Sequence, residues 1–153
     1  MMNCPGRCVA PWARNLAADL RAIEHWRADI LLSLLDDDEF ERLGVPQFVD
    51  FAGARELTWH RLPIADFGIP DAGALITWQR MSPDIRAVLQ GGGRVAIHCA
   101  AGLGRTGMMA AHLLVALGGD ADTVIAAVRR ARPGTIETAA QEAFVRGGPS
   151  FDF

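Results

Sequence analysis

The chain has 153 residues, of which 50% are hydrophobic and 22% charged, as expected for a globular protein with one buried core. Its formal net charge of −3 gives no basic field for nucleic acid or anionic membranes, and no apolar run is long enough for a transmembrane helix or a secretory signal. The three cysteines cannot all pair within one chain, which favours reduced thiols and a cytoplasmic protein.

The first half of the chain predicts two strands and two helices. Residues 15–28 have apolar side chains at every third or fourth position, which indicates an amphipathic helix. Residues 29–35 are a short apolar run typical of a buried strand. The acidic residues that follow fit a helix N-terminus, in which Asp36 is the cap and Glu39 its partner three positions later. Residues 57–64 alternate enough to predict another strand.

The second half adds one strand and several helices. Residues 72–90 predict a helix that is interrupted near Ser82 and Pro83, where a second helix can start. Residues 94–98 are a β-branched strand. Three more helices are predicted after it: 107–117, 121–132 and 135–145. The alternation predicts an α/β fold, with a mostly parallel central sheet flanked by helices on both faces, in one domain over residues 1–153.

The segment HCAAGLGRTG, residues 98–107, joins the last strand to the next helix. A loop that enters a helix N-terminus directs several backbone N–H groups to one point, and this forms an anion site. Gly102 and Gly104 let the backbone curl. Arg105 adds a planar guanidinium that can hold two phosphate oxygens. Cys99 lies at the mouth of these donors, which favour its thiolate form.

These residues predict phosphoryl transfer through a cysteinyl-phosphate, formed when the Cys99 thiolate attacks phosphorus in line. Arg105 and the loop amides would hold the charged oxygens. The loop positions involved are Ala100, Ala101, Gly102, Leu103 and Gly104. Thr106 can donate a hydrogen bond to the thiolate or help it to leave, and His98 would orient the loop rather than act as a base. The alternative is a tight glycine turn that carries a buried cysteine.

The order His-Cys, five residues, Arg and Thr resembles the signature of the cysteine-dependent tyrosine and dual-specificity protein phosphatases. The wider resemblance runs from CPGRC through VPQFVDF and LPIADFGIPD to the loop, and it is to the branch around the cyclin-dependent-kinase-associated phosphatase. It implies the compact cysteine-phosphatase fold, a phosphorylated protein as substrate, and neither a metal nor an organic cofactor. The short chain also suggests a shallow site that admits phosphoserine and phosphothreonine besides phosphotyrosine.

The departing alcohol or phenol needs a proton, and the family supplies it from an aspartate on a loop before the cysteine. Asp66 and Asp71 are both candidates in this sequence. The resemblance places the acid on the aspartate of Pro-Ile-Ala-Asp, which is Asp66. Asp71 directly precedes a predicted helix and also fits an N-cap.

The segment RPGTIETAAQ resembles the part of the tyrosine-specific phosphatases in which glutamines position the hydrolytic water. Gln141 matches the second glutamine, and Glu137 stands where the first would be. Their spacing puts them on one face of the expected helix. The alternative is an exposed polar pair on the last helix.

Other functions fit the sequence less well. Phosphoinositide phosphatases often carry lysines inside the loop, where this chain has alanines and a leucine. A sulfurtransferase would lack the Pro-Ile-Ala-Asp loop and the Arg-Thr ending. A phosphate-binding module without catalysis would be natural if Cys99 or Arg105 were missing. Cys4 and Cys8 allow a metal knuckle or a redox pairing with Cys99, but two ligands alone do not define a zinc site.

Overall fold

The computed structural model describes residues 1–11, 13–55 and 57–147. The expected domain over 1–153 also includes residues 12, 56 and 148–153, which lie outside this part. The described residues form a parallel sheet of three strands in the order β2-β1-β3. The strands are β1 (Ile30–Ser33), β2 (Thr58–Arg61) and β3 (Val95–His98). The predicted α/β class with a parallel sheet is therefore confirmed.

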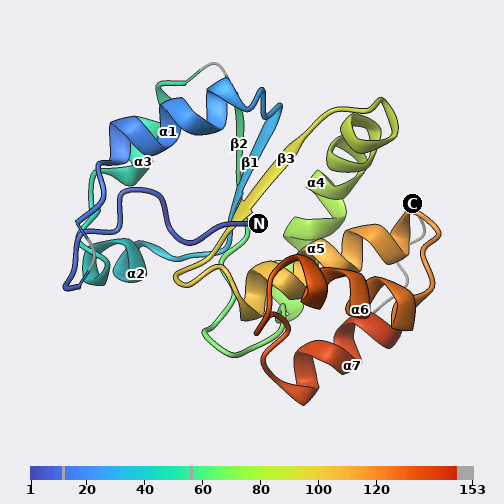
Figure 1. Cartoon of the computed structure of the whole chain (residues 1–153). Helices are drawn as coiled ribbons and strands as arrows, with labels where there is room; N and C mark the ends of the chain where they lie inside the picture. The colour runs from blue at the N-terminus through green and yellow to red at the C-terminus, as the bar shows by residue number, and fades with distance from the viewer. Residues whose placement is uncertain (12, 56, 148–153) are drawn as a thin grey trace.

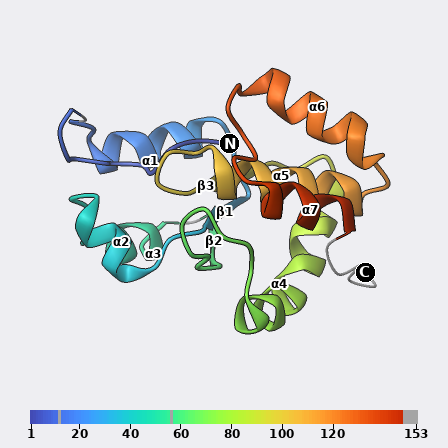
Figure 2. The ribbon, with the colours of Figure 1, turned by 90° about the horizontal axis from the view of Figure 1, so that it is seen from below.

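Helices cover both faces of this sheet (Figures 1 and 2). One group is α1 (Leu16–His25), α2 (Asp37–Arg42) and α3 (Phe48–Gly53), and the other is α4 (Ala72–Gln90), α5 (Gly104–Ala116), α6 (Ala121–Ala131) and α7 (Ala139–Gly147). The chain moves outward from β1 to β2 and then crosses back over β1 to β3. Because such crossovers are right-handed, the two connections lie on opposite faces. Among the described helices, none is both long and apolar enough to cross a membrane.

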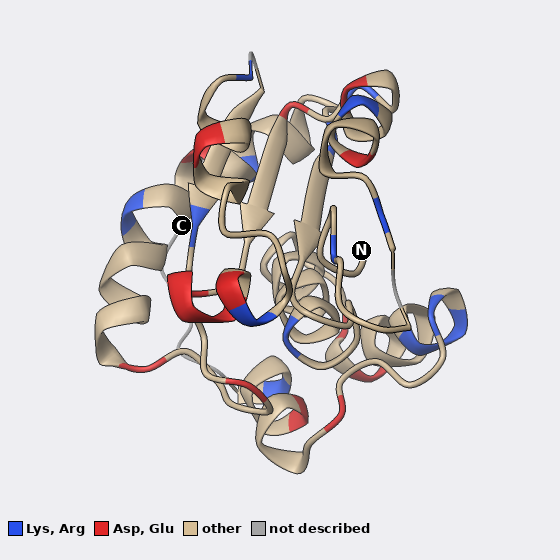
Figure 3. Cartoon of the chain, turned by 90° about the vertical axis from the view of Figure 1, so that its left-hand side faces the viewer, with Lys and Arg blue, Asp and Glu red and all other residues tan. Residues whose placement is uncertain are grey.

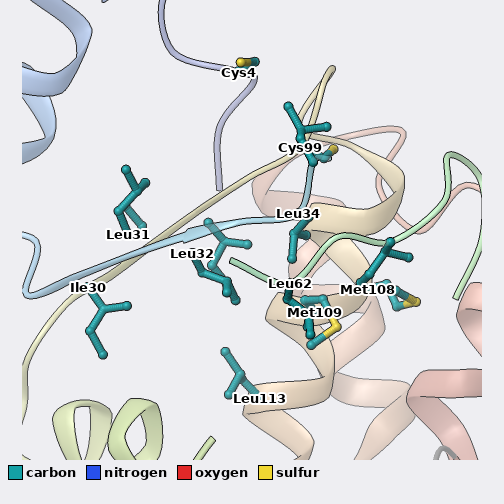
Figure 4. Close-up of a cluster of buried hydrophobic side chains, with 14 of the residues drawn as sticks. Cys4, Ile30, Leu31, Leu32, Leu34, Leu62, Cys99, Met108, Met109 and Leu113 are labelled. Atoms are coloured by element: carbon teal, nitrogen blue, oxygen red, sulfur yellow. The ribbon is translucent and has the colours of Figure 1, made fainter. Parts of the chain in front are cut away.

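The central strand β1 is buried along its whole length, as its continuous apolar sequence predicts. Leu31 and Leu32 are fully buried there. Figure 4 shows this strand beside α5, whose Met108, Met109 and Leu113 belong to the same buried cluster. Each such side chain contributes about 1.5–3 kcal/mol by leaving water. The apolar packing fixes β1 against the helix that begins at the loop after β3.

Several details of the secondary structure differ from the sequence predictions, and α5 begins at Gly104 rather than at residue 107. The predicted break near Ser82 and Pro83 is wrong, because α4 continues through Pro83 from Ala72 to Gln90. Proline removes one helical hydrogen bond, but Trp78 and Ile85 on either side of it are fully buried and hold the helix together. Helix α3 was not predicted. The last helix starts at Ala139 rather than at residue 135, because Ile136 has a positive φ of 58°.

Candidate active site

The site lies where the carboxyl ends of β1 and β3 meet. Ser33 and His98, the last residues of these strands, are partners in the parallel register. The loop after β3 runs directly into α5, which begins at Gly104. In open α/β sheets, such adjacent strand ends with diverging connections form the usual ligand crevice. The structure thus has the strand–loop–helix arrangement that the sequence predicted.

The loop curls around the sulfur of Cys99, whose side chain is only 3% exposed. The backbone N–H of Gly102 donates a hydrogen bond to Cys99 Sγ at 3.3 Å. Gly102 has a φ of +72°, and a Cβ at this position would overlap the backbone of Met2. The hydroxyl of Thr106 is buried and bonds to no described atom. Its predicted hydrogen bond to Cys99 is therefore not formed in this structure.

Arg105 is 1% exposed and is anchored through one of its three nitrogens. Its Nη1 donates to both carboxylate oxygens of Glu39 at 2.9 Å and to the carbonyl of Ile64 at 2.8 Å. Nη2 lies 2.9 Å from Asp66 Oδ1, an ion pair without hydrogen-bond alignment. No described atom accepts a hydrogen bond from Nε or Nη2. These two form the side of the guanidinium that binds two oxygens of one anion.

Glu39 was predicted only as a capping residue, and its contact with Arg105 was missed. The predicted capping box is confirmed, since Asp36 accepts from Glu39 N at 2.7 Å and Glu39 accepts from Asp36 N. Acidic residues occupy the whole first turn of α2 (Figure 3). Only the parallel pairing of β1 with β3 shows which acid reaches Arg105. An acidic run directly after a buried strand was the signal available in the sequence.

His98 is fully buried in a chain of three side chains. The carbonyl of Cys99, 3.4 Å from His98 Nδ1, can only accept a hydrogen bond, so in the neutral imidazole Nδ1 carries the proton. Nε2 then accepts from the Ser33 hydroxyl at 2.6 Å, and Ser33 Oγ accepts from the indole Nε1 of Trp59 at 2.9 Å. Burial is the main cause that lowers the pKa of His98 to about 3, and the positive charge of Arg105 acts in the same direction. His98 is therefore neutral and bound to the loop, in agreement with an orienting role.

The two candidate acids have different surroundings. Asp71 is the N-cap of α4 and accepts a hydrogen bond from Ala74 N at 2.7 Å. Asp66 has a side chain that is 59% exposed and lies beside Arg105. It also accepts from Phe67 N, where the backbone has a positive φ of 56°. The structure thus brings Asp66, and not Asp71, to the guanidinium.

Gln141 and Glu137 lie against the start of α5. Gln141 is fully buried, accepts from Glu137 N at 2.9 Å and donates to the carbonyl of Gly68 at 3.2 Å. A Cβ on Gly104 would collide with Glu137 Oε2 and lie 3.0 Å from the Gln141 amide. Glu137 precedes α7, so the expectation that both residues share one helix face is wrong. The alternative of an exposed pair holds for Glu137, which is exposed, and is wrong for the buried Gln141.

The N-terminal cysteines lie in different environments. Cys4 is buried and Cys8 exposed, and both are unpaired, as is Cys99. The backbone N–H of Cys4 donates to the carbonyl of Ala100 at 3.2 Å, and Figure 4 shows Cys4 on the segment beside the Cys99 loop. Burial raises the pKa of the Cys4 thiol to about 12. Within the described ranges, His, Cys, Asp and Glu side chains form no group of three that could hold a metal ion.

Known proteins share this architecture. The structure superposes on that of a kinase-associated phosphatase whose catalytic cysteine is replaced by serine, with a TM-score of 0.83, 24% identity and coverage of 95% of this chain and 82% of that one. The active form of the phosphatase Tk-PTP gives a TM-score of 0.66 at 29% identity, covering 85% of this chain and 84% of that one. The fold is that of the dual-specificity class of cysteine-dependent phosphatases.

Sequence comparisons give the particular family. Residues 9–119 match the family model "Polymorphic toxin system, DSP-PTPase phosphatase", and the chain belongs to this family. It is 28% identical over 125 residues to cyclin-dependent kinase inhibitor 3 of Rattus norvegicus, covering 76% of this chain and 58% of that protein. It is 38% identical over 87 residues to the tyrosine-protein phosphatase CDC14 of Candida albicans, covering 54% of this chain and 16% of that protein. The chain thus spans less than two thirds of either relative.

Replacing Glu39 by glutamine should lower the free energy of unfolding by about 3–5 kcal/mol, because Arg105 loses its buried anionic partner and keeps only the mostly exposed Asp66. Because glutamine preserves the capping box, the loss of unfolding free energy measures the effect of the Glu39 charge. The control is Asp37→Asn in the same helical turn, whose ion pair with Arg61 is exposed and worth at most about 1 kcal/mol. Urea unfolding measures both. Equal losses of unfolding free energy in the two variants would show that the buried ion pair contributes no more to stability than the exposed one.

The low pKa of His98 predicts a stability that depends on pH. The unfolded chain takes up a proton below about pH 6.5, whereas folded His98 stays neutral down to about 3. The stability that comes from keeping His98 neutral is therefore complete above pH 6.5. As the pH falls from 6.5 toward 3, the free energy of unfolding decreases by up to about 1.4 kcal/mol per pH unit. The substitution His98→Asn should make the unfolding free energy depend less steeply on pH over this range, by the equivalent of nearly one proton. Urea titrations at a series of pH values measure this slope. An unchanged slope would contradict the buried neutral imidazole.

Proposed function

We propose that the chain is one phosphatase domain that hydrolyses phosphomonoesters on proteins through a cysteinyl-phosphate. One observation carries the proposal. The buried Arg105 is held at Nη1 by Glu39, and its Nε and Nη2 remain as a pair of donors beside a loop that curls around Cys99 Sγ. A buried cation at a helix N-terminus whose N–H groups make no hydrogen bond is suited to a dianionic phosphate. This arrangement supports a phosphate-binding loop over residues 99–105.

The first chemical step forms the sulfur–phosphorus bond. The Cys99 thiolate attacks phosphorus while the bond to the leaving oxygen breaks, and Asp66 protonates that oxygen. The loop N–H groups and Arg105 stabilise the charge on the equatorial oxygens throughout. The backbone N–H of Gly102 donates to the sulfur at 3.3 Å and holds it at the centre of the loop. The neutral His98 contributes by fixing the Cys99 carbonyl, not by taking a proton.

The second step hydrolyses the cysteinyl-phosphate. Asp66, now a carboxylate, accepts a proton from the attacking water, and the Cys99 thiolate leaves with Thr106 as the expected donor. Gln141 and Glu137 are proposed to orient this water. Their support is their position against Gly104, where the amide of Gln141 has one N–H beyond its bond to Gly68.

Asp66 is preferred over Asp71 as the general acid because of what each side chain already does. Asp71 is occupied as the cap of α4, whereas Asp66 is mostly exposed and within 2.9 Å of the Arg105 guanidinium. An acid at the rim of the phosphate site can reach the leaving oxygen. Phosphate bound at Nη2 would replace this ion pair, and Asp66 must carry a proton before it can act as the acid.

The proposed substrates are phosphotyrosine proteins, with phosphoserine and phosphothreonine also admitted. The relatives named as tyrosine-protein phosphatases and as a kinase-associated phosphatase support a protein substrate. A phosphoinositide substrate is less favoured, because no lysine stands among residues 100–104 to meet further phosphates. We also propose a reducing, cytoplasmic location, which the three unpaired cysteines support.

The substitution Cys99→Ser should lower hydrolysis of p-nitrophenyl phosphate by about 10⁴-fold or more, because the hydroxyl is a poor nucleophile at neutral pH. The wild type should keep its full rate in EDTA. Steady-state assays with matched thermal unfolding curves measure both effects. Activity that survives in Cys99→Ser and disappears on chelation would remove the mechanism.

Asp66→Asn should slow hydrolysis of phenyl phosphate by about 10²–10⁴-fold, because the departing phenol then lacks its proton donor. A general acid works only while protonated, so the wild-type rate falls as pH rises, and this alkaline limb should vanish in the variant. Asp71→Asn is the control, since asparagine also caps helices. Profiles of kcat against pH decide the assignment. An alkaline limb that persists in Asp66→Asn, or disappears in Asp71→Asn, would refute it.

A further inference from the structure

The peptide unit between Ala101 and Gly102 makes a hydrogen bond at each of its two ends. Its N–H, on Gly102, donates to Cys99 Sγ at 3.3 Å. Its carbonyl, on Ala101, accepts from Arg132 Nη2 at 3.1 Å. In a trans peptide the C=O and the N–H point in opposite directions. A donor that holds the carbonyl on the outside therefore also holds the N–H toward the sulfur.

The two preceding carbonyls of the loop are held in the same way. The carbonyl of Cys99 faces His98 Nδ1 at 3.4 Å, and that of Ala100 accepts from Cys4 N at 3.2 Å. An anion-binding loop needs this arrangement, because an inward carbonyl would repel the anion. Of the three donors, the guanidinium of Arg132 carries a full positive charge, and it reaches the loop from another element, at the end of α6.

The position of Arg132 is fixed by its own backbone. It is the C-cap of α6, and its N–H donates to the carbonyl of Val128 at 3.0 Å. Its carbonyl accepts from the Thr135 hydroxyl at 2.9 Å. The Thr135 side chain in turn packs where Gly107 of α5 has no Cβ. Arg132 is thus placed against the same helix that the loop enters.

We propose that Arg132 is a positioning residue that keeps the Ala101–Gly102 peptide in the orientation that binds phosphate. Gly102 makes such a device necessary, because glycine visits both hands of φ readily and the peptide can rotate at little cost. With its carbonyl released, the peptide can turn its oxygen toward the sulfur. Arg132 acts through the loop and not on the substrate. The inference rests on the proposed phosphate site.

The test is the affinity for inorganic phosphate, measured by calorimetry, of Arg132→Met against Arg130→Met. Arg130 is exposed and only two residues away, so its substitution removes the same charge without touching the loop. We expect Arg132→Met to bind phosphate about tenfold more weakly than Arg130→Met, the loss of one charge-assisted hydrogen bond. The ¹⁵N resonance of Gly102 should shift in Arg132→Met alone, and thermal unfolding should show both variants folded.

Equal phosphate affinities in the two variants would overturn the inference, whereas a wild type that binds no phosphate would overturn the proposed function itself. If Arg132→Met does not fold, Arg132→Lys and Arg130→Lys carry the test, since both keep the charge. Weaker binding in Arg132→Lys alone supports the positioning role, because lysine lacks the planar guanidinium. Equal binding in the lysine pair overturns it.

Discussion

The buried ion pair between Arg105 and Glu39 is the interaction on which the site depends. A guanidinium that is 1% exposed has lost its hydration, and its burial is tolerable only with an anionic partner in good geometry. Glu39 supplies that partner from α2, after β1, while Arg105 comes from α5, after β3. The parallel pairing of β1 with β3 is what brings them together. The sheet topology therefore brings together the residues of the proposed phosphate site.

The same few groups give the site both its rigidity and its charge. Glu39 completes a capping box and holds Arg105 with one carboxylate. His98 ends a buried hydrogen-bonded chain and also faces a loop carbonyl. Because buried polar networks tolerate little rearrangement, such groups hold the donors in place before the substrate arrives. The rim, with Asp66 and Phe67, is the exposed part. In the proposed mechanism, phosphate is bound by preorganised groups at the base of the site and the proton is transferred at its edge.

Local sequence patterns were sufficient for much of the fold. The buried strand β1, the loop after β3 and the cap at Asp36 follow from periodicity and short-range hydrogen bonding. The predicted helix break at Pro83 was wrong because burial of the neighbouring side chains outweighed the local effect of proline. The partnership of Glu39 with Arg105 was out of reach, since it joins residues 66 positions apart and depends on strand order. The shared helix face of Glu137 and Gln141 was a wrong prediction because a positive φ at Ile136 delays the helix and leaves Glu137 outside it.

A crystal structure of the Cys99→Ser protein with inorganic phosphate tests the central claim most directly. The account predicts one phosphate inside the loop, with two of its oxygens on Nε and Nη2 of Arg105 and the others on loop N–H groups. Nη1 should remain on Glu39 and Ile64. A phosphate bound elsewhere, or an Arg105 that leaves Glu39 to reach it, would contradict the claim that this ion pair prepares the site.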